Sequence, residues 1–331
     1  MTDARTAYRL EINGIVQGVG FRPFIYQLAN HHGLKGEVAN TATGVSLVLE
    51  GPENDIRQFI DDLSIKRPPL AHIVEVSETR VAVNGFTAFS IVKSRGSATR
   101  ATLISPDVMV CDDCLAEMRD PVDRRFGDPF INCTTCGPRY TIIDDIPYDR
   151  PKTSMRHFRM CPLCQAEYDD PDNRRFHAQP NACPVCGPRV TLCDAGGNAA
   201  DTDDPIAETA NRLRLGRIVA VKGLGGYHLA EEATHADAVA RLRLRKHREE
   251  KPLALMCNSL DRIREIARFG DAEERLLVSI QRPIVLLEKR ENTPIAETVS
   301  PRNRYFGIML PYTPLHHLLL DSGFVALVMT S

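Results

Sequence analysis

Eight of the ten cysteines in this 331-residue chain form four Cys-x-x-Cys pairs, separated by 18, 24 and 18 residues. A Cys-x-x-Cys turn points two thiolates at one centre, and two such turns complete the tetrahedral four-sulfur shell of a structural zinc site. The array therefore predicts two structural zinc ions. Because thiolates fill every position, neither metal has an open site for catalysis. The predicted ligands are Cys111, Cys114, Cys133, Cys136, Cys161, Cys164, Cys183 and Cys186.

A shift of 50 residues superimposes one half of this array on the other, which indicates a tandem duplication. Because a duplicated unit keeps its own ligand set, we assign the first four cysteines to one metal and the last four to the other. An interleaved pairing is the alternative that the sequence leaves open. The matching segments are 111–114 with 161–164, 120–121 with 170–171, 124–126 with 174–176, and 133–139 with 183–189.

Paired cysteines also occur in disulfides and in redox dithiols. The chain opens with MTDARTAYRL and shows no apolar signal segment, so we expect a cytoplasmic protein with reduced thiols. Redox Cys-x-x-Cys motifs usually occur singly, which also favours zinc. Cys193 and Cys257 stand outside the array, and we expect both to be small buried side chains.

Composition divides the chain into three predicted domains. They cover residues 1–93, 104–193 and 200–331, and the polar segment Lys93–Thr99 is expected to link the first two. The formal charge of −2 and the pI near 6.6 give no overall attraction to nucleic acid or to an anionic membrane. The last segment, Phe324–Met329, has the pattern of a buried strand, so we expect the third domain to be incomplete at its C-terminal end.

The hydrophobic pattern of the first domain predicts the order βαββαβ and hence a ferredoxin-like sandwich of helices on an antiparallel sheet. Between the first strand and the first helix lies the glycine-rich segment Gly14–Arg22. Such a loop can turn successive N–H groups toward one anion, and the fork of Arg22 can hold two of its oxygens. The predicted strands are 8–12, 36–40 and 45–49, with a closing strand or strand pair over 73–92, and the predicted helices are 21–32 and 54–65.

The loop and the segment Gly36–Asn40 together resemble the two signature motifs of the acylphosphatase family, over roughly the first 92 residues. The resemblance implies that Arg22 binds the phosphoryl group of an acyl phosphate and that Asn40 positions the attacking water. Holding the phosphoryl group and orienting water supplies most of the catalysis, because an acyl phosphate is already activated. The implied phosphate-binding loop is Val16, Gln17, Gly18, Val19, Gly20 and Phe21.

The C-terminal portion predicts a second α/β domain, with a helix expected to begin at Thr234 and to end in the basic run Arg241–Pro252. By composition alone, a solvated charged face is the better interpretation of that run. However, the segments 222–256, 310–317 and 329–331, in that order, resemble the YrdC-like nucleotide-binding domain, which is a twisted α/β fold. The resemblance implies that ATP, with its Mg²⁺, is bound by Lys246, Arg248, Lys251, Thr330 and Ser331.

The order of an acylphosphatase-like domain, tandem Cys₄ repeats and a YrdC-like domain is similar to that of the HypF-type carbamoyltransferases of [NiFe]-hydrogenase maturation. The resemblance implies that carbamoyl phosphate is hydrolysed at the first domain. The carbamate would then be channelled to the YrdC-like domain, where ATP converts it to carbamoyl-adenylate. A further domain would pass the carbamoyl group to the C-terminal cysteine of a HypE-type partner, for cyanide ligand synthesis.

Two other functions fit part of the sequence. A YrdC-like domain could make threonylcarbamoyl-adenylate for tRNA modification, although the acylphosphatase motif weighs against this. The zinc repeats could instead form zinc ribbons that bind nucleic acid, although the nearly neutral net charge argues against that function. The candidate nucleic-acid contacts are Arg124, Arg125, Arg139, Arg174, Arg175 and Arg189.

Overall fold

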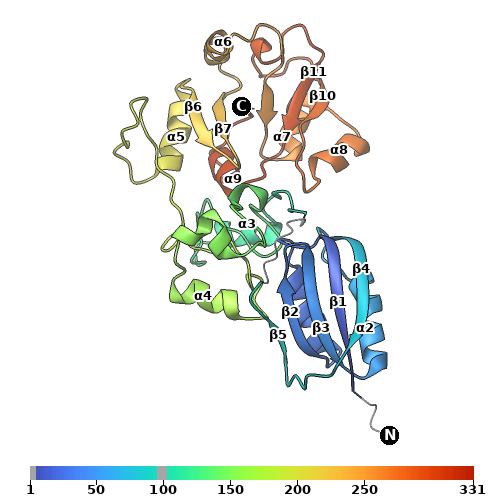
Figure 1. Ribbon diagram of the computed structural model, residues 1–331. Helices are drawn as coiled ribbons and strands as arrows, with labels where there is room; N and C mark the ends of the chain where they lie inside the picture. The colour runs from blue at the N-terminus through green and yellow to red at the C-terminus, as the bar shows by residue number, and fades with distance from the viewer. Residues whose placement is uncertain (1–4, 95–102) are drawn as a thin grey trace. The chain divides into compact units, whose positions relative to one another are not determined.

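The structure is a computed structural model that describes residues 5–94 and 103–331. The chain forms two compact units, each with its own β-sheet (Figure 1). The first unit contains residues 1–107 and 132–187, and the second contains residues 108–131 and 188–331. Most of the predicted linker 93–99 lies outside the described residues.

The first unit contains a five-stranded sheet in the order β4-β1-β3-β2-β5. The strands β1, β3, β2 and β4 pair antiparallel, and β5 adds to β2 in parallel. The helices α1 and α2 share one hydrophobic cluster with the sheet, which confirms the predicted ferredoxin-like order. The bounds are β1 Thr6–Ile15, α1 Phe21–His31, β2 Lys35–Asn40, β3 Gly44–Gly51, α2 Glu53–Ile65, β4 His72–Val81 and β5 Phe89–Ile91.

Period-two burial in β1 explains why this segment is a strand. Leu10 and Ile12 are fully buried, whereas Arg9 beside Leu10 is exposed. On α1, Phe21 and Ile25 lie four residues apart on one face and are buried in the same cluster. Burying each such side chain contributes roughly 1.5–3 kcal/mol to stability, which fixes β1 and α1 in the core. The glycine-rich loop between them is therefore anchored at both ends.

The duplicated cysteine segments share local features of their fold. In both repeats a Cys-x-x-Cys pair opens a helix, α3 (Asp112–Arg119) or α4 (Pro162–Asp169). In both, an aspartate after the helix accepts a hydrogen bond from the backbone two residues later, at 3.0 Å in each case. The tandem duplication is therefore visible in the fold as well as in the sequence. Short 3₁₀ helices follow the first repeat at Tyr140–Ile142, Arg150–Lys152 and Ser154–His157.

The second unit is built on a seven-stranded sheet in the order β6-β7-β12-β8-β11-β10-β9. Only β8 and β11 pair in parallel among its strands. Hydrophobic clusters are present on both faces: one includes residues of α6 and α7, and the other includes residues of α5 and α9. This sandwich is the α/β architecture that the sequence predicted.

The helix expected to begin at Thr234 begins two residues later, because the backbone N–H of His235 bonds to Glu232 in a turn before the helix. The buried strand expected at Phe324–Met329 is shorter and is shifted toward the C-terminus. The bounds are α5 Pro205–Arg214, β6 Val219–Lys222, β7 Tyr227–Glu232, α6 Ala236–Arg245, β8 Ala254–Met256, α7 Leu260–Ile266, β9 Ala267–Arg268, α8 Asp271–Leu277, β10 Val285–Lys289, a 3₁₀ helix Glu297–Val299, β11 Tyr305–Met309, α9 Pro314–Leu320 and β12 Leu327–Thr330.

Within the described residues, none of the helices is both long enough and apolar enough to cross a bilayer.

Candidate phosphate and metal sites

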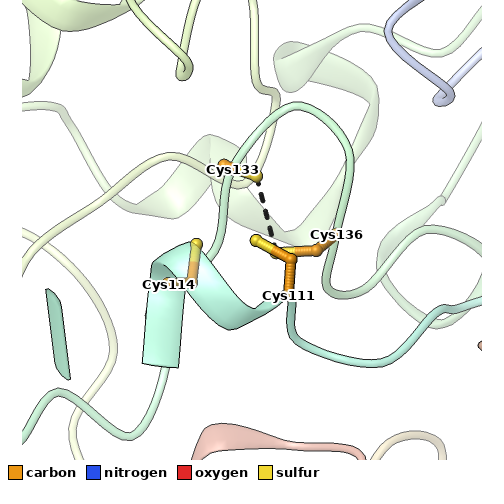
Figure 2. Close-up of side chains that lie close together, drawn as sticks. All are labelled: Cys111, Cys114, Cys133 and Cys136. Atoms are coloured by element: carbon orange, nitrogen blue, oxygen red, sulfur yellow. Dashed lines mark hydrogen bonds between the residues drawn. The ribbon is translucent and has the colours of Figure 1, made fainter. Parts of the chain in front are cut away.

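The eight predicted zinc ligands form two groups of four sulfurs. In each group all four Sγ atoms lie within 4.8 Å of one another. Figure 2 shows the first group, in which four cysteine side chains gather around a common centre. The grouping is the sequential one, with Cys111, Cys114, Cys133 and Cys136 in one set and Cys161, Cys164, Cys183 and Cys186 in the other.

The sulfur spacing fits a metal and not a disulfide. A tetrahedral zinc with Zn–S bonds of about 2.3 Å holds its sulfurs about 3.8 Å apart. The Sγ–Sγ distances are 3.6 Å for Cys133–Cys136 and 3.9 Å for Cys161–Cys183. All ten cysteines are free thiols. Both sets can therefore bind zinc without rearrangement, and zinc there would stabilise the fold of its repeat.

The expectation that Cys193 and Cys257 are both buried is wrong for one of them. Cys257 is fully buried in the second unit, but Cys193 is exposed. Cys193 lies beside a polar turn in which Asp194 accepts hydrogen bonds from Gly196 and Asn198, so no apolar layer covers it.

The predicted phosphate-binding loop is curled at its two central glycines. Gly18 and Gly20 have positive φ angles of 74° and 75°, which L side chains rarely adopt. Among the described residues, no hydrogen bond is found to the backbone N–H of Val19 or Gly20. These donors precede the N-terminus of α1, whose partial positive charge also favours an anion.

Arg22 lies on the first turn of α1 and is buried beside this loop. Its Nη1 forms an ion pair with Asp149 Oδ1 at 2.9 Å, and its Nη2 donates to the carbonyl oxygen of Tyr148 at 3.4 Å. A guanidinium has five N–H donors, so these two contacts leave three for an anion. Asp149 and Tyr148 therefore hold the arginine in place without using all its donors.

Asn40, at the end of β2, is buried next to Arg22. Its Nδ2 donates to the same Tyr148 carbonyl at 3.1 Å, while its Oδ1 is buried and has no hydrogen-bond partner. Gln17 fixes the carbonyl, because its Oε1 accepts from the N–H of Tyr148 at 2.8 Å. The amide of Asn40 is thus oriented with a free acceptor, which suits a bound water.

Arg22, Asn40 and the loop line one small cavity of about 20 Å³. Residues from the cysteine-rich segment, including Tyr148, His177 and Gln179, line the same cavity. Burial raises the pKa of the Tyr148 phenol to about 12, so this side chain is neutral at pH 7.

Arg139 connects the phosphate loop to the cysteine turn 133–136. Its side chain is 2% exposed, and its Nε donates to the carbonyl oxygen of Gly18. Its Nη1 and Nη2 donate to the carbonyl oxygens of Cys136 and Thr134, both at 2.8 Å. The carbonyl of Gly18 is therefore hydrogen-bonded, and the buried arginine holds the loop in its curled form. Arg139 was not assigned to this site from the sequence.

Four of the five predicted nucleotide-binding residues meet at the end of β12 in the second unit. Arg248 Nη1 donates to Thr330 Oγ1 at 3.2 Å, and Lys246 Nζ donates to the carbonyl oxygen of Ser331. Lys251 is exposed, and its carbonyl accepts from Arg248 Nε at 3.0 Å. Lys246 also lines a cleft of about 980 Å³, within the size range of ligand sites.

Burial contradicts part of the nucleic-acid alternative. Arg125, Arg139 and Arg175 are between 2% and 4% exposed, so they cannot reach a phosphate backbone. Arg175 Nε, for example, donates to the carbonyl oxygen of Asn132 at 3.1 Å. These arginines look like surface contacts in the sequence, but the fold buries all three.

Comparisons with known proteins agree with this organisation. Residues 8–91 match the acylphosphatase family model, residues 110–143 and 160–193 match the HypF finger model, and residues 211–331 match the model described as telomere recombination. The chain is 50% identical over 318 residues to the carbamoyltransferase HypF2 of Cupriavidus necator, which covers 95% of this chain and 39% of that protein. The chain belongs to the HypF family.

A solved structure supports the assignment to the HypF family. Full-length HypF in a phosphate- and nucleotide-bound form superimposes with a TM-score of 0.95 at 45% identity, covering 100% of this chain and 43% of that one. The probable carbamoyltransferase HypF of Methanocaldococcus jannaschii is 46% identical over 328 residues, which is 98% of this chain and 42% of that protein. The chain thus spans about two fifths of the length of these HypF relatives.

The acylphosphatase of Pseudothermotoga lettingae is 44% identical over 84 residues, covering 25% of this chain and 93% of that protein. A stand-alone acylphosphatase therefore matches the first domain and leaves no counterpart for the cysteine-rich residues that line the cavity.

Proposed function

We propose that this chain carries out the early steps of carbamoyl transfer in [NiFe]-hydrogenase maturation, beginning with hydrolysis of carbamoyl phosphate in the first unit. The observation that carries the proposal is the convergence of Arg22, the buried acceptor of Asn40 and the loop N–H groups on one small cavity. The relatives named carbamoyltransferase supply the substrate class.

In the proposed reaction, the phosphoryl oxygens bind the N–H groups of the loop and the three remaining donors of Arg22. Asn40 Oδ1 accepts a hydrogen bond from a water molecule and aims its oxygen at phosphorus. The P–O bond to the carbamoyl group breaks, carbamate leaves with the electron pair, and the protons of the water stay with phosphate or pass to solvent. The cavity excludes bulk water, which strengthens each of these polar contacts.

We propose that ATP is used in the second unit, with Lys246, Arg248, Lys251, Thr330 and Ser331 as the nucleotide-binding residues. Carbamate would attack the α-phosphorus of ATP, so that carbamoyl-adenylate forms and pyrophosphate leaves, with Mg²⁺ neutralising phosphate charge. Carbamate decomposes readily in water, so channelling it to the YrdC-like domain raises its yield. The proposed acceptor of the carbamoyl group is the C-terminal cysteine of a HypE-type partner, and cyanide ligand synthesis follows from that product.

The zinc ions in this proposal are structural, and each would be bound by one Cys₄ set. We also propose the three predicted domains, 1–93, 104–193 and 200–331, as the functional divisions of the chain. A cytoplasmic location remains our prediction.

Phosphate release from carbamoyl phosphate tests the first step. We expect release above the spontaneous rate from the wild-type chain and none above it from Arg22→Ala. Equal release by the two proteins would contradict the assignment of Arg22. For the second step, carbamoyl phosphate should support ATP–pyrophosphate exchange better than threonine does. A preference for threonine would favour threonylcarbamoyl-adenylate synthesis instead.

A further inference from the structure

The tandem duplication provides an internal comparison at one position of the phosphate cavity. Gly127 in the first repeat and His177 in the second lie 50 residues apart and have equivalent backbone contacts. The N–H of Gly127 donates to Met118 at 2.8 Å, and the N–H of His177 donates to Tyr168 at 3.0 Å. Met118 and Tyr168 are also 50 residues apart, so the two turns are structural copies.

Both copies need a left-handed backbone at this position. The φ angle is +66° at Gly127 and +53° at His177. Glycine adopts this conformation freely, whereas a residue with a Cβ is disfavoured there. The first repeat therefore contains the residue that folding favours, and the second retains a strained histidine. Strain of this kind is concentrated at functional sites, where the side chain has a role that offsets its cost.

The side chain of His177 lies where such a role can be performed. It lines the cavity that contains Arg22 and Asn40, and its ring packs 4.6 Å from Phe176 and 4.9 Å from Tyr168 between ring centroids. Among the described residues, neither ring nitrogen has a hydrogen-bond partner. The ring is thus held in place by its aromatic neighbours while its polar atoms stay available.

The imidazole of His177 is neutral in this setting, which suits it to hydrogen bonding. Burial, together with the nearby Arg22 guanidinium, lowers the pKa of His177 to about 4. The ring is therefore neutral at pH 7, with one N–H donor and one acceptor nitrogen. A neutral donor can bind a carbonyl oxygen without neutralising the phosphate that Arg22 has to hold.

We propose that His177 is a further catalytic residue of the acyl phosphate site, which donates its ring N–H to the carbonyl oxygen of the carbamoyl group. This inference rests on the proposed hydrolysis of carbamoyl phosphate. As the P–O bond breaks, negative charge grows on the carboxylate of the departing carbamate, and the hydrogen bond from His177 becomes stronger. The loop and Arg22 hold the phosphoryl end of the substrate, and His177 holds the acyl end.

His177→Gly is the test variant, because the chain itself uses glycine at the equivalent position of the first repeat and the backbone can keep its conformation. We expect kcat/KM for carbamoyl phosphate to fall by about 10- to 100-fold, as expected for one hydrogen bond to a group that is becoming charged. Inorganic phosphate should inhibit with a Ki unchanged within about twofold, because it has no acyl end. His177→Asn, which tolerates the left-handed backbone and retains an N–H donor, should recover part of the loss.

Thermal unfolding of each variant checks that the repeat remains folded. Wild-type kcat/KM in His177→Gly would overturn the proposal, and so would a parallel loss of phosphate binding and turnover, because that result indicates a structural role. No recovery in a folded His177→Asn would also count against it. Failure of the proposed function is distinguishable, because the wild-type chain would then release no phosphate above the spontaneous rate.

Discussion

Replacing Arg139 by methionine tests how the cysteine-rich segment supports the phosphate loop. Methionine retains much of the volume of the buried arginine but donates no hydrogen bonds. Five carbonyl oxygens would each lose a charged donor, those of Gly18, Cys133, Thr134, Cys136 and Pro138. We expect two effects of this substitution: lower stability of the first unit and weaker phosphate binding.

The size of the stability effect follows from the contacts. A buried acceptor left unsatisfied costs about 1–3 kcal/mol, and the five acceptors are not independent, because water can reach some of them once the side chain is gone. A loss of about 3–5 kcal/mol is therefore expected. For phosphate, release of Gly18 lets the loop leave its curled form, so we expect affinity to fall by about 10-fold or more.

The duplication supplies the matched control. Arg189 lies 50 residues after Arg139, in the same Cys-Gly-Pro-Arg sequence, but it is exposed. Arg189→Met should change stability by no more than about 0.5 kcal/mol. Because the chain has no tryptophan, urea unfolding is best followed by far-ultraviolet circular dichroism with tyrosine fluorescence, and phosphate binding by calorimetry. Similar effects of Arg139→Met and Arg189→Met would refute the reasoning.

Three further predictions concern other parts of the chain. Metal analysis should find about two zinc ions per chain, and well under two would contradict the Cys₄ assignment. Glu231 is fully buried, its carboxyl oxygens have no hydrogen-bond partner, and burial raises its pKa to about 7. The protonated side chain therefore contributes stability that is fully present below the pKa of the unfolded state. That stability is lost as pH rises through about 7. In urea titrations, the free energy of unfolding of Glu231→Gln should therefore rise relative to that of wild type between about pH 5 and 8, by up to roughly 3 kcal/mol. A difference between the two unfolding free energies that stays constant over this pH range would refute this. Lys246→Met should weaken ATP binding about 10-fold by calorimetry, and unchanged affinity would remove Lys246 from the nucleotide site.

The grouping of the eight cysteines and the curled glycine loop could be predicted because both depend on local spacing. A Cys-x-x-Cys turn brings two sulfurs together, and glycines before a helix expose N–H groups, whatever the rest of the chain does. The sheet of the first unit was predictable for a similar reason, since the alternation at Arg9, Leu10 and Ile12 is a property of one strand.

The rest of the candidate site could not be predicted, because it depends on contacts between residues far apart in the chain. Asp149 pairs with Arg22 across 127 positions, and Arg139 reaches Gly18 across 121. In the sequence, Arg139 and Arg189 have the same local context, and only the fold buries one and exposes the other. The mismatch of Gly127 and His177 between the repeats is visible in the sequence, but it gains a meaning only once the fold places His177 at the cavity.

The most direct test of the central claim is hydrolysis of carbamoyl phosphate in water enriched in ¹⁸O, with the released phosphate analysed by mass spectrometry. If Asn40 directs water at phosphorus while the loop and Arg22 hold the phosphoryl group, the wild-type chain releases phosphate that contains one ¹⁸O atom per turnover, and Asn40→Ala does so far more slowly. Phosphate released at the spontaneous rate, or without the label, would contradict the account.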